Sequence, residues 1–134
     1  MKRVFADTYY FLALLNTKDA QHVAVRQFSA AHSLHLVTTT WVLTEVADAL
    51  CKAPYRRTCA QFLRQLRNDK ESTVFEPTML LFEQGLTLYE SRTDKDWSLT
   101  DCISFTVMNT EGLTEALTGD RHFEQAGYKA LLKP

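Results

Sequence analysis

The chain has little glycine and proline, 4 and 3 of its 134 residues, which argues against a disordered, collagen-like or loop-dominated protein. Its 3 cysteines, Cys51, Cys59 and Cys102, are odd in number and show no C-x-x-C spacing. The sequence therefore supports neither a disulfide framework nor a cysteine zinc site. No apolar run approaches the ~20 residues that a membrane-spanning helix needs. We expect one soluble, cytoplasmic domain over residues 1–134, with no membrane partner.

The net charge is only −1 and does not by itself indicate a nucleic-acid partner, but the charges are unevenly distributed. Residues 52–70 have a net charge of +5, whereas residues 71–120 have a net charge of −8. A basic stripe beside an acidic region is consistent with a metal-holding pocket next to a surface that binds a polyanion. The alternative for the basic stripe is a solvated helix face.

Alternating strand and helix patterns predict an α/β fold. We expect short strands at residues 3–6, 34–38, 73–75, 115–118 and 128–132. The predicted helices cover about residues 8–16, 18–31, 40–52, 55–68, 78–91 and 98–109. Such alternation implies βαβ units and a central, mainly parallel sheet that is covered on both faces.

Two acidic residues follow predicted strands and should therefore meet at one edge of the sheet. Asp7 comes directly after the first strand, and Asp120 comes two residues after the fourth. Ligands of such sheets bind outside the carboxyl ends of the strands. Each residue also has a purely structural interpretation, because Asp7 could cap the following helix and Asp120 could belong to a turn.

Two further carboxylates lie on predicted helices. Glu45 lies beside an apolar stripe rather than opposite it, and Asp101 lies on a helix that is apolar around nearly its whole circumference. The alternatives are a solvated Glu45 and a capping box formed by Ser98 and Asp101. A buried ionised carboxylate is costly unless it binds a cation or its pKa is raised. Convergence of several carboxylates favours Mg²⁺ or Mn²⁺.

Four segments in order give the chain a resemblance to the PIN-domain ribonuclease family, and its size is similar to that of the VapC-type toxins of toxin–antitoxin pairs. The first two are Val-Phe-Ala-Asp7-Thr-Tyr-Tyr and Thr40-Trp-Val-Leu-Thr-Glu45-Val-Ala-Asp-Ala-Leu. The third is Trp97-Ser-Leu-Thr-Asp101-Cys-Ile-Ser-Phe, and the fourth, Thr118-Gly-Asp120-Arg-His-Phe123, is similar to the family's T-x-D-x-x-F ending. Each segment is weak alone, but the four together extend over nearly the whole chain.

The resemblance implies a three-layer α/β/α sandwich and a metal-dependent endoribonuclease that uses one or two Mg²⁺ or Mn²⁺ ions. The acidic residues that it implies as the catalytic metal cluster are Asp7, Glu45, Asp101 and Asp120. It implies Thr118 as a supporting hydroxyl and Asp96 as a second-tier ligand or water-positioning residue; a solvated Asp96 is the alternative. A small antitoxin protein and a homodimer are the further partners that the resemblance implies.

The basic stripe is the expected contact surface for the RNA backbone. Its candidate residues are Lys52, Arg56, Arg57, Arg64 and Arg67. His122 follows an acid and could therefore lie near the site, but we favour a surface or packing role for it. The alternative functions are a non-cleaving PIN-fold module that binds RNA or protein, and a housekeeping RNA-processing nuclease. An aspartate-dependent phosphatase or receiver domain fits less well, because Asp7 is followed by Thr8 and Tyr9 and no D-x-D motif is present.

Overall fold

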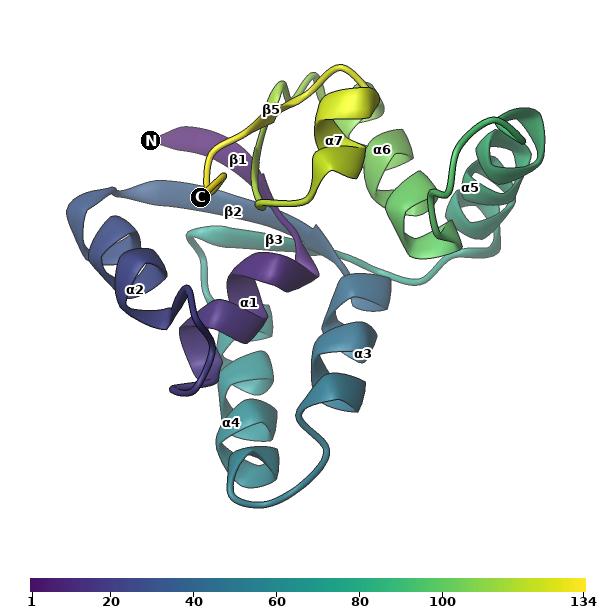
Figure 1. Ribbon diagram of the computed structural model, residues 1–134. Helices are drawn as coiled ribbons and strands as arrows, with labels where there is room; N and C mark the ends of the chain where they lie inside the picture. The colour runs from purple at the N-terminus through teal and green to yellow at the C-terminus, as the bar shows by residue number, and fades with distance from the viewer.

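A five-stranded sheet forms the middle layer of the computed structural model, which describes residues 1–134 (Figure 1). The strands are β1 (Lys2–Ala6), β2 (Leu34–Thr39), β3 (Ser72–Phe75), β4 (Glu115–Leu117) and β5 (Lys129–Ala130). Their order is β3-β2-β1-β4-β5, and every neighbouring pair is parallel. Parallel sheets are covered on both faces, and the central strand β1 accordingly has Val4, Phe5 and Ala6 fully buried.

Helices cover both faces of the sheet, so the predicted three-layer α/β/α architecture is confirmed (Figure 1). One layer contains α1 (Thr8–Leu15), α2 (His22–Ala31), α3 (Thr40–Ala49) and α4 (Tyr55–Asn68). The other contains α5 (Met79–Ser91), α6 (Leu99–Glu111) and α7 (Arg121–Gln125). No helix is both long enough and apolar enough to cross a bilayer.

Side-chain caps decide where several helices begin. Thr39 accepts a hydrogen bond from the Val42 N–H at 3.2 Å, so α3 begins at Thr40, as the hydroxyls of this segment predict. The start of α2 differs from the prediction, because the helix begins at His22 and not near Lys18. Asn16 and Asp19 accept hydrogen bonds from backbone N–H groups two residues ahead, and these local bonds hold the intervening residues in turns.

Helix α7 was not among the predicted elements. It has five residues, which is too short for a hydrophobic period to be recognised. Its single buried residue, Phe123, packs with ring centroids 6.2 Å from Phe5 of β1 and 5.0 Å from Phe105 of α6. This aromatic contact fixes α7 against the sheet and against the middle of α6, and therefore fixes the residues at the start of α7.

Gly85 lets α5 and α6 approach closely, and we expect its replacement by alanine to destabilise the fold. A Cβ atom at this buried position would lie 2.3 Å from Cγ1 of Ile103 and 3.2 Å from the Ile103 backbone. The better helix propensity of alanine offsets only about 1 kcal/mol of this clash. The free energy of unfolding should therefore fall by about 1–2 kcal/mol, as measured by urea denaturation. Glu90→Ala on the exposed face of α5 is the control. A urea midpoint that is unchanged in Gly85→Ala would contradict the close contact between Gly85 and Ile103.

Candidate metal and active site

The carboxylates meet where the strand order reverses. The chain proceeds from β1 outward through β2 and β3 on one side, whereas β4 and β5 lie on the other. Asp7 directly follows β1, and its N–H donates to the Leu117 carbonyl at the end of β4 at 3.3 Å. Asp120 follows β4 after a two-residue connection. Crevices at this kind of switch point are the usual ligand sites of parallel sheets.

Asp7 is a buried carboxylate with one dedicated partner. It occupies the N-cap position of α1, but its side chain makes no capping hydrogen bond, so the capping interpretation describes its position and not its bonding. Its side chain is buried, and Oδ2 accepts a hydrogen bond of 2.8 Å from the Thr118 hydroxyl, which is itself fully buried. Thr118 thus orients the Asp7 carboxylate from the neighbouring strand end.

Burial raises the pKa of the Asp7 carboxyl from 3.8 to about 7. Desolvation is the main cause, because the charged form loses its hydration in the interior. The hydrogen bond from Thr118 lowers the pKa, and the negative charges of Asp101 and Asp120 raise it further. Three carboxylates therefore lie within electrostatic reach of one another, and a cation between them would relieve both the burial and the repulsion.

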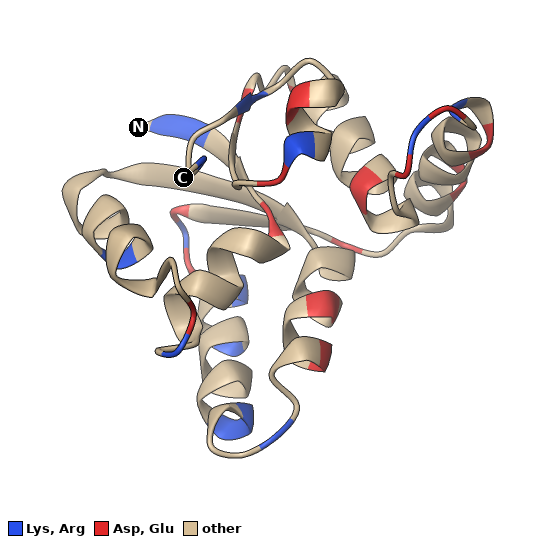
Figure 2. Cartoon of the chain, in the orientation of Figure 1, with Lys and Arg blue, Asp and Glu red and all other residues tan.

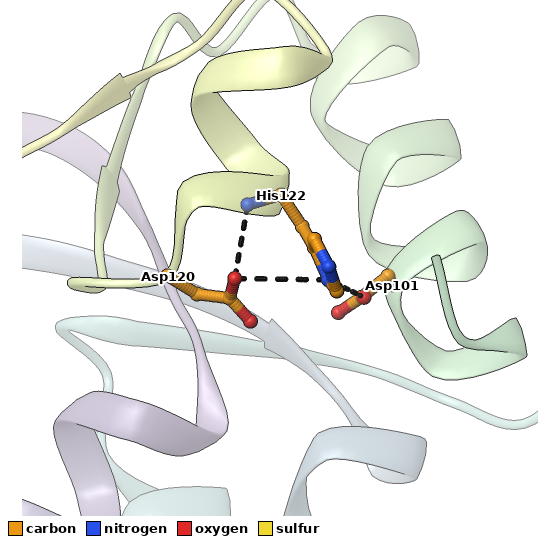
Figure 3. A group of neighbouring side chains, drawn as sticks. All are labelled: Asp101, Asp120 and His122. Atoms are coloured by element: carbon orange, nitrogen blue, oxygen red, sulfur yellow. Dashed lines mark hydrogen bonds and ion pairs between the residues drawn. The ribbon is translucent and has the colours of Figure 1, made fainter. Parts of the chain in front are cut away.

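Asp101 serves two purposes at once. It forms the predicted capping box, since its N–H donates to Ser98 Oγ at 3.0 Å and its Oδ2 accepts from the Ser98 N–H at 3.2 Å. The same Oδ2 lies 3.0 Å from Nδ1 of His122. The rest of α6 is buried around most of its circumference, as predicted, so the first turn of this helix is held rigidly at the sheet edge. The Asp101 carboxylate is only 14% exposed and points toward α7 (Figure 3).

His122 joins Asp101 and Asp120 into a compact group (Figure 3). Asp120 is the N-cap of α7, and its Oδ1 accepts the His122 N–H at 2.9 Å. His122 Nδ1 lies 3.6 Å from that same oxygen, and the ligand atoms of all three residues lie within 4.8 Å of one another. The structure thus favours the alternative position near the site over the surface or packing role that we preferred for His122. Its position two residues after a capping acid was the available signal.

Glu45 and Asp96, the remaining predicted acidic residues, lie outside this group. Glu45 Oε1 accepts a hydrogen bond of 2.6 Å from Thr8, the residue after Asp7, so α3 brings Glu45 to the same end of the sheet. It is half-buried and lies outside the compact group. Asp96 is exposed in the loop between α5 and α6 and also lies outside the group. The structure thus associates Asp101, Asp120 and His122 closely, with Asp7 and Glu45 beside them.

The donors at this site fit a divalent cation that prefers oxygen ligands. In Asp101 and Asp120 the hydrogen bonds to neighbouring residues use one carboxylate oxygen, which leaves Asp101 Oδ1 and Asp120 Oδ2 free for other partners. Carboxylate oxygens are the ligands that Mg²⁺ and Mn²⁺ take in proteins, with water completing the coordination. The raised pKa of Asp7 is the expected sign of a carboxylate that lacks a counter-charge.

The arginines of the basic stripe lie on α4, next to the acidic helix α3, and Lys52 precedes α4 (Figure 2). A cleft of about 970 Å³ separates the two helices. Its lining includes Arg56, Arg64 and Arg67, together with Thr44 and Asp48 of α3. Arg56 donates to the Cys51 carbonyl at 2.9 Å, so its guanidinium is held at the end of the cleft. Lys52 and Arg57 are exposed and do not line it.

The chain is similar to known proteins over nearly its whole length. No protein-family model matches it. It is 28% identical over 125 residues to the 23S rRNA-specific endonuclease VapC20 of two Mycobacterium tuberculosis strains, CDC 1551 and H37Rv, covering 93% of this chain and 95% of the relative. The crystal structure of M. tuberculosis VapC20, described as a sarcin–ricin loop cleaving toxin, superposes with a TM-score of 0.83 at 27% identity and covers 93% of this chain and 95% of that one. The chain is similar to PIN-domain proteins of the VapC type in both sequence and fold.

A more distant structure shares the fold of this chain. FitAcB from Neisseria gonorrhoeae superposes with a TM-score of 0.59 at 13% identity, covering 95% of this chain and 94% of that one. At this identity the likeness concerns the fold alone. The similarity to VapC20 confirms the resemblance noted in the sequence, and it extends over nearly the whole chain.

Proposed function

We propose that this protein is a metal-dependent endoribonuclease and the toxin of a type II toxin–antitoxin pair. The observation that carries the proposal is the convergence of Asp7, Asp101 and Asp120 at the sheet edge, within a fold that superposes on VapC20 at a TM-score of 0.83. VapC20 is named as an endonuclease specific for 23S rRNA, and its structure is described as that of a toxin. An RNA substrate is therefore the class that we infer for this chain.

In the proposed site, Asp7, Asp101 and Asp120 hold a divalent ion, Mg²⁺ or Mn²⁺. When bound, such an ion lowers the pKa of a ligated water and neutralises the charge of the phosphate. Thr118 holds the Asp7 carboxylate in place through its 2.8 Å hydrogen bond. Glu45, one of whose oxygens accepts the Thr8 hydroxyl, completes the cluster and is our candidate acceptor for the proton of the attacking water.

The test of this function is cleavage of RNA by the purified protein. The panel contains single-stranded RNA, structured RNA and an rRNA stem-loop, each incubated with Mg²⁺, with Mn²⁺ or with EDTA. We expect cutting with a divalent ion, no cutting in EDTA and recovery when the ion is restored. RNA that binds but is never cut under any condition would favour the non-cleaving binding module, and cutting that persists in EDTA would contradict metal dependence.

We propose that α4 holds the RNA backbone, and reversing Arg64 and Arg67 to Glu should weaken that binding. Both residues line the cleft beside α3, so their guanidinium groups can contact phosphates and release counterions. Loss of two contacts with a single strand should reduce the slope of log affinity against log salt by at least about 1.4. Binding is measured in EDTA, so that cleavage does not interfere. Reversal of the exposed Lys18 and Arg26 is the control, and an equal effect of both pairs would remove α4 from the interface.

We also infer two protein partners and a cellular location. The toxin description of VapC20 supports a small antitoxin protein as the first partner. A second copy of this chain is the other, and the exposed Met79, Leu80 and Tyr89 of α5 support it, because apolar side chains on one helix are commonly covered in dimers. An rRNA substrate would place the protein in the cytoplasm. Light scattering on the purified protein decides between monomer and dimer.

A further inference from the structure

The imidazole of His122 lies where the carboxylates of the proposed metal site converge. Its Nδ1 is 3.0 Å from Asp101 Oδ2 and 3.6 Å from Asp120 Oδ1, and the ring is only 21% exposed (Figure 3). Both contacts use the same nitrogen, so the ring presents its Nδ1 edge to the carboxylates. The bond from the His122 N–H to Asp120 fixes the backbone that carries the ring.

The two carboxylates do not need the ring to complete their structural roles. Asp101 already closes the capping box with Ser98, and Asp120 already caps α7 through a backbone N–H. Each retains an oxygen that makes no hydrogen bond with a neighbouring residue. The ring therefore adds a nitrogen donor to a group of oxygen donors whose atoms lie within 4.8 Å, the spacing expected of ligands that share one ion.

We propose that His122 is a direct ligand of the divalent ion, through Nδ1, and that this nitrogen makes the site prefer Mn²⁺ over Mg²⁺. The inference rests on the proposed metal-dependent function and specifies its metal. Ligation through Nδ1 requires the tautomer whose proton is on Nε2, so the ion would replace the hydrogen bond that Nδ1 shares with Asp101.

The preference follows from the chemistry of the donors. Mg²⁺ is a hard ion that keeps oxygen ligands and several waters, and it gains little from an imidazole. First-row transition ions accept imidazole nitrogen readily, and Mn²⁺ also accepts carboxylate oxygens. A site with three carboxylates and one imidazole therefore discriminates between the two ions, whereas a site of carboxylates alone would discriminate less.

Pulsed electron paramagnetic resonance on bound Mn²⁺ tests this ligation without relying on activity. Tag-free protein is loaded with Mn²⁺ alone, and the spin-echo modulation is examined for coupling to a ¹⁴N nucleus. We expect nitrogen coupling in the natural chain and in the control variant His35→Asn. In the natural chain the His35 ring hydrogen-bonds Thr73, between β2 and β3 and outside the carboxylate cluster. We expect the coupling to vanish in His122→Asn and in His122→Gln.

Equilibrium binding of Mn²⁺ and Mg²⁺ to the same proteins gives the second measurement. His122→Asn should weaken Mn²⁺ binding by at least about tenfold and change Mg²⁺ binding by less than about threefold. Bound Mn²⁺ without nitrogen coupling, or an equal loss for both ions, would overturn the ligation and leave the proposed nuclease intact. A natural chain that binds neither ion, or that binds Mn²⁺ equally well after Asp101→Asn, would overturn the metal site itself.

Discussion

Asp101→Asn is expected to lower the rate of RNA cleavage at least about 100-fold. Substitution of a residue that only supports a metal ligand lowers metal affinity or activity about 10–100-fold. Loss of the charge of a ligand itself should therefore lower activity by at least about 100-fold. The fold should persist, because the asparagine amide oxygen can still accept the Ser98 N–H that Asp101 accepts at 3.2 Å. The measurement is the single-turnover rate on one RNA at saturating metal.

The control for this substitution is Glu71→Gln, which also converts a carboxylate to an amide. Glu71 is exposed and precedes β3, so it lies at the opposite end of the sheet from the cluster. Its rate should stay within about twofold of the natural chain, as expected for a surface substitution away from the site. Equal rates for Asp101→Asn and Glu71→Gln would remove Asp101 from the catalytic site.

Asp7→Asn is expected to stabilise the metal-free protein at alkaline pH while abolishing cleavage. Burial raises the pKa of Asp7 from 3.8 to about 7, so between these values the folded state keeps a proton that the unfolded state has lost. Folding stability therefore falls as the pH rises through this window, by about 4 kcal/mol if the whole difference in pKa applies. Asparagine has no charge to bury and removes this dependence. At pH 8 the free energy of unfolding should increase by about 2–4 kcal/mol.

Urea denaturation in EDTA at several pH values between 4 and 8 measures this effect. The natural chain should lose stability through the range, and Asp7→Asn should show a flatter profile. Asp96→Asn provides the control, because this carboxylate is exposed in a loop and its substitution should leave the profile unchanged. If the pH profiles of the natural chain and Asp7→Asn are parallel, folding does not raise the pKa of Asp7. That result would contradict a buried carboxylate at this position.

The layer architecture and the major helices could be predicted because their signals are local and long. Helix α4 has the bounds expected from its basic amphipathic pattern, Tyr55–Asn68. Helix α6 is buried around most of its circumference, as its apolar residues indicate. The rule that ligands bind at the carboxyl ends of parallel strands also predicted that Asp7 and Asp120, which are far apart in sequence, would lie at one edge of the sheet.

What could not be predicted depends on contacts between distant segments. The burial of Asp7 comes from the packing around it and from Thr118, 111 residues away, which no local pattern reveals. Helix α7 is too short to produce a period, and its position depends on Phe123 packing between Phe5 and Phe105. Because α7 carries His122, the missing helix prediction also explains why a packing role was preferred for this side chain. Asp96 illustrates the converse, since an acid near the site in sequence is exposed and outside the cluster.

We propose that the carboxylate cluster uses a divalent ion to hydrolyse RNA with water. Hydrolysis by an activated water leaves linear phosphate ends and needs no 2′-hydroxyl, whereas acid–base catalysis by His122 would use the 2′-hydroxyl and pass through a 2′,3′-cyclic phosphate. The most direct measurement is cleavage of an RNA that carries a single 2′-deoxy nucleotide at its cut site, with analysis of the product ends. We expect cutting at an undiminished rate with linear ends only. An uncut deoxy substrate and cyclic ends from the all-ribose RNA would contradict metal-activated hydrolysis by water.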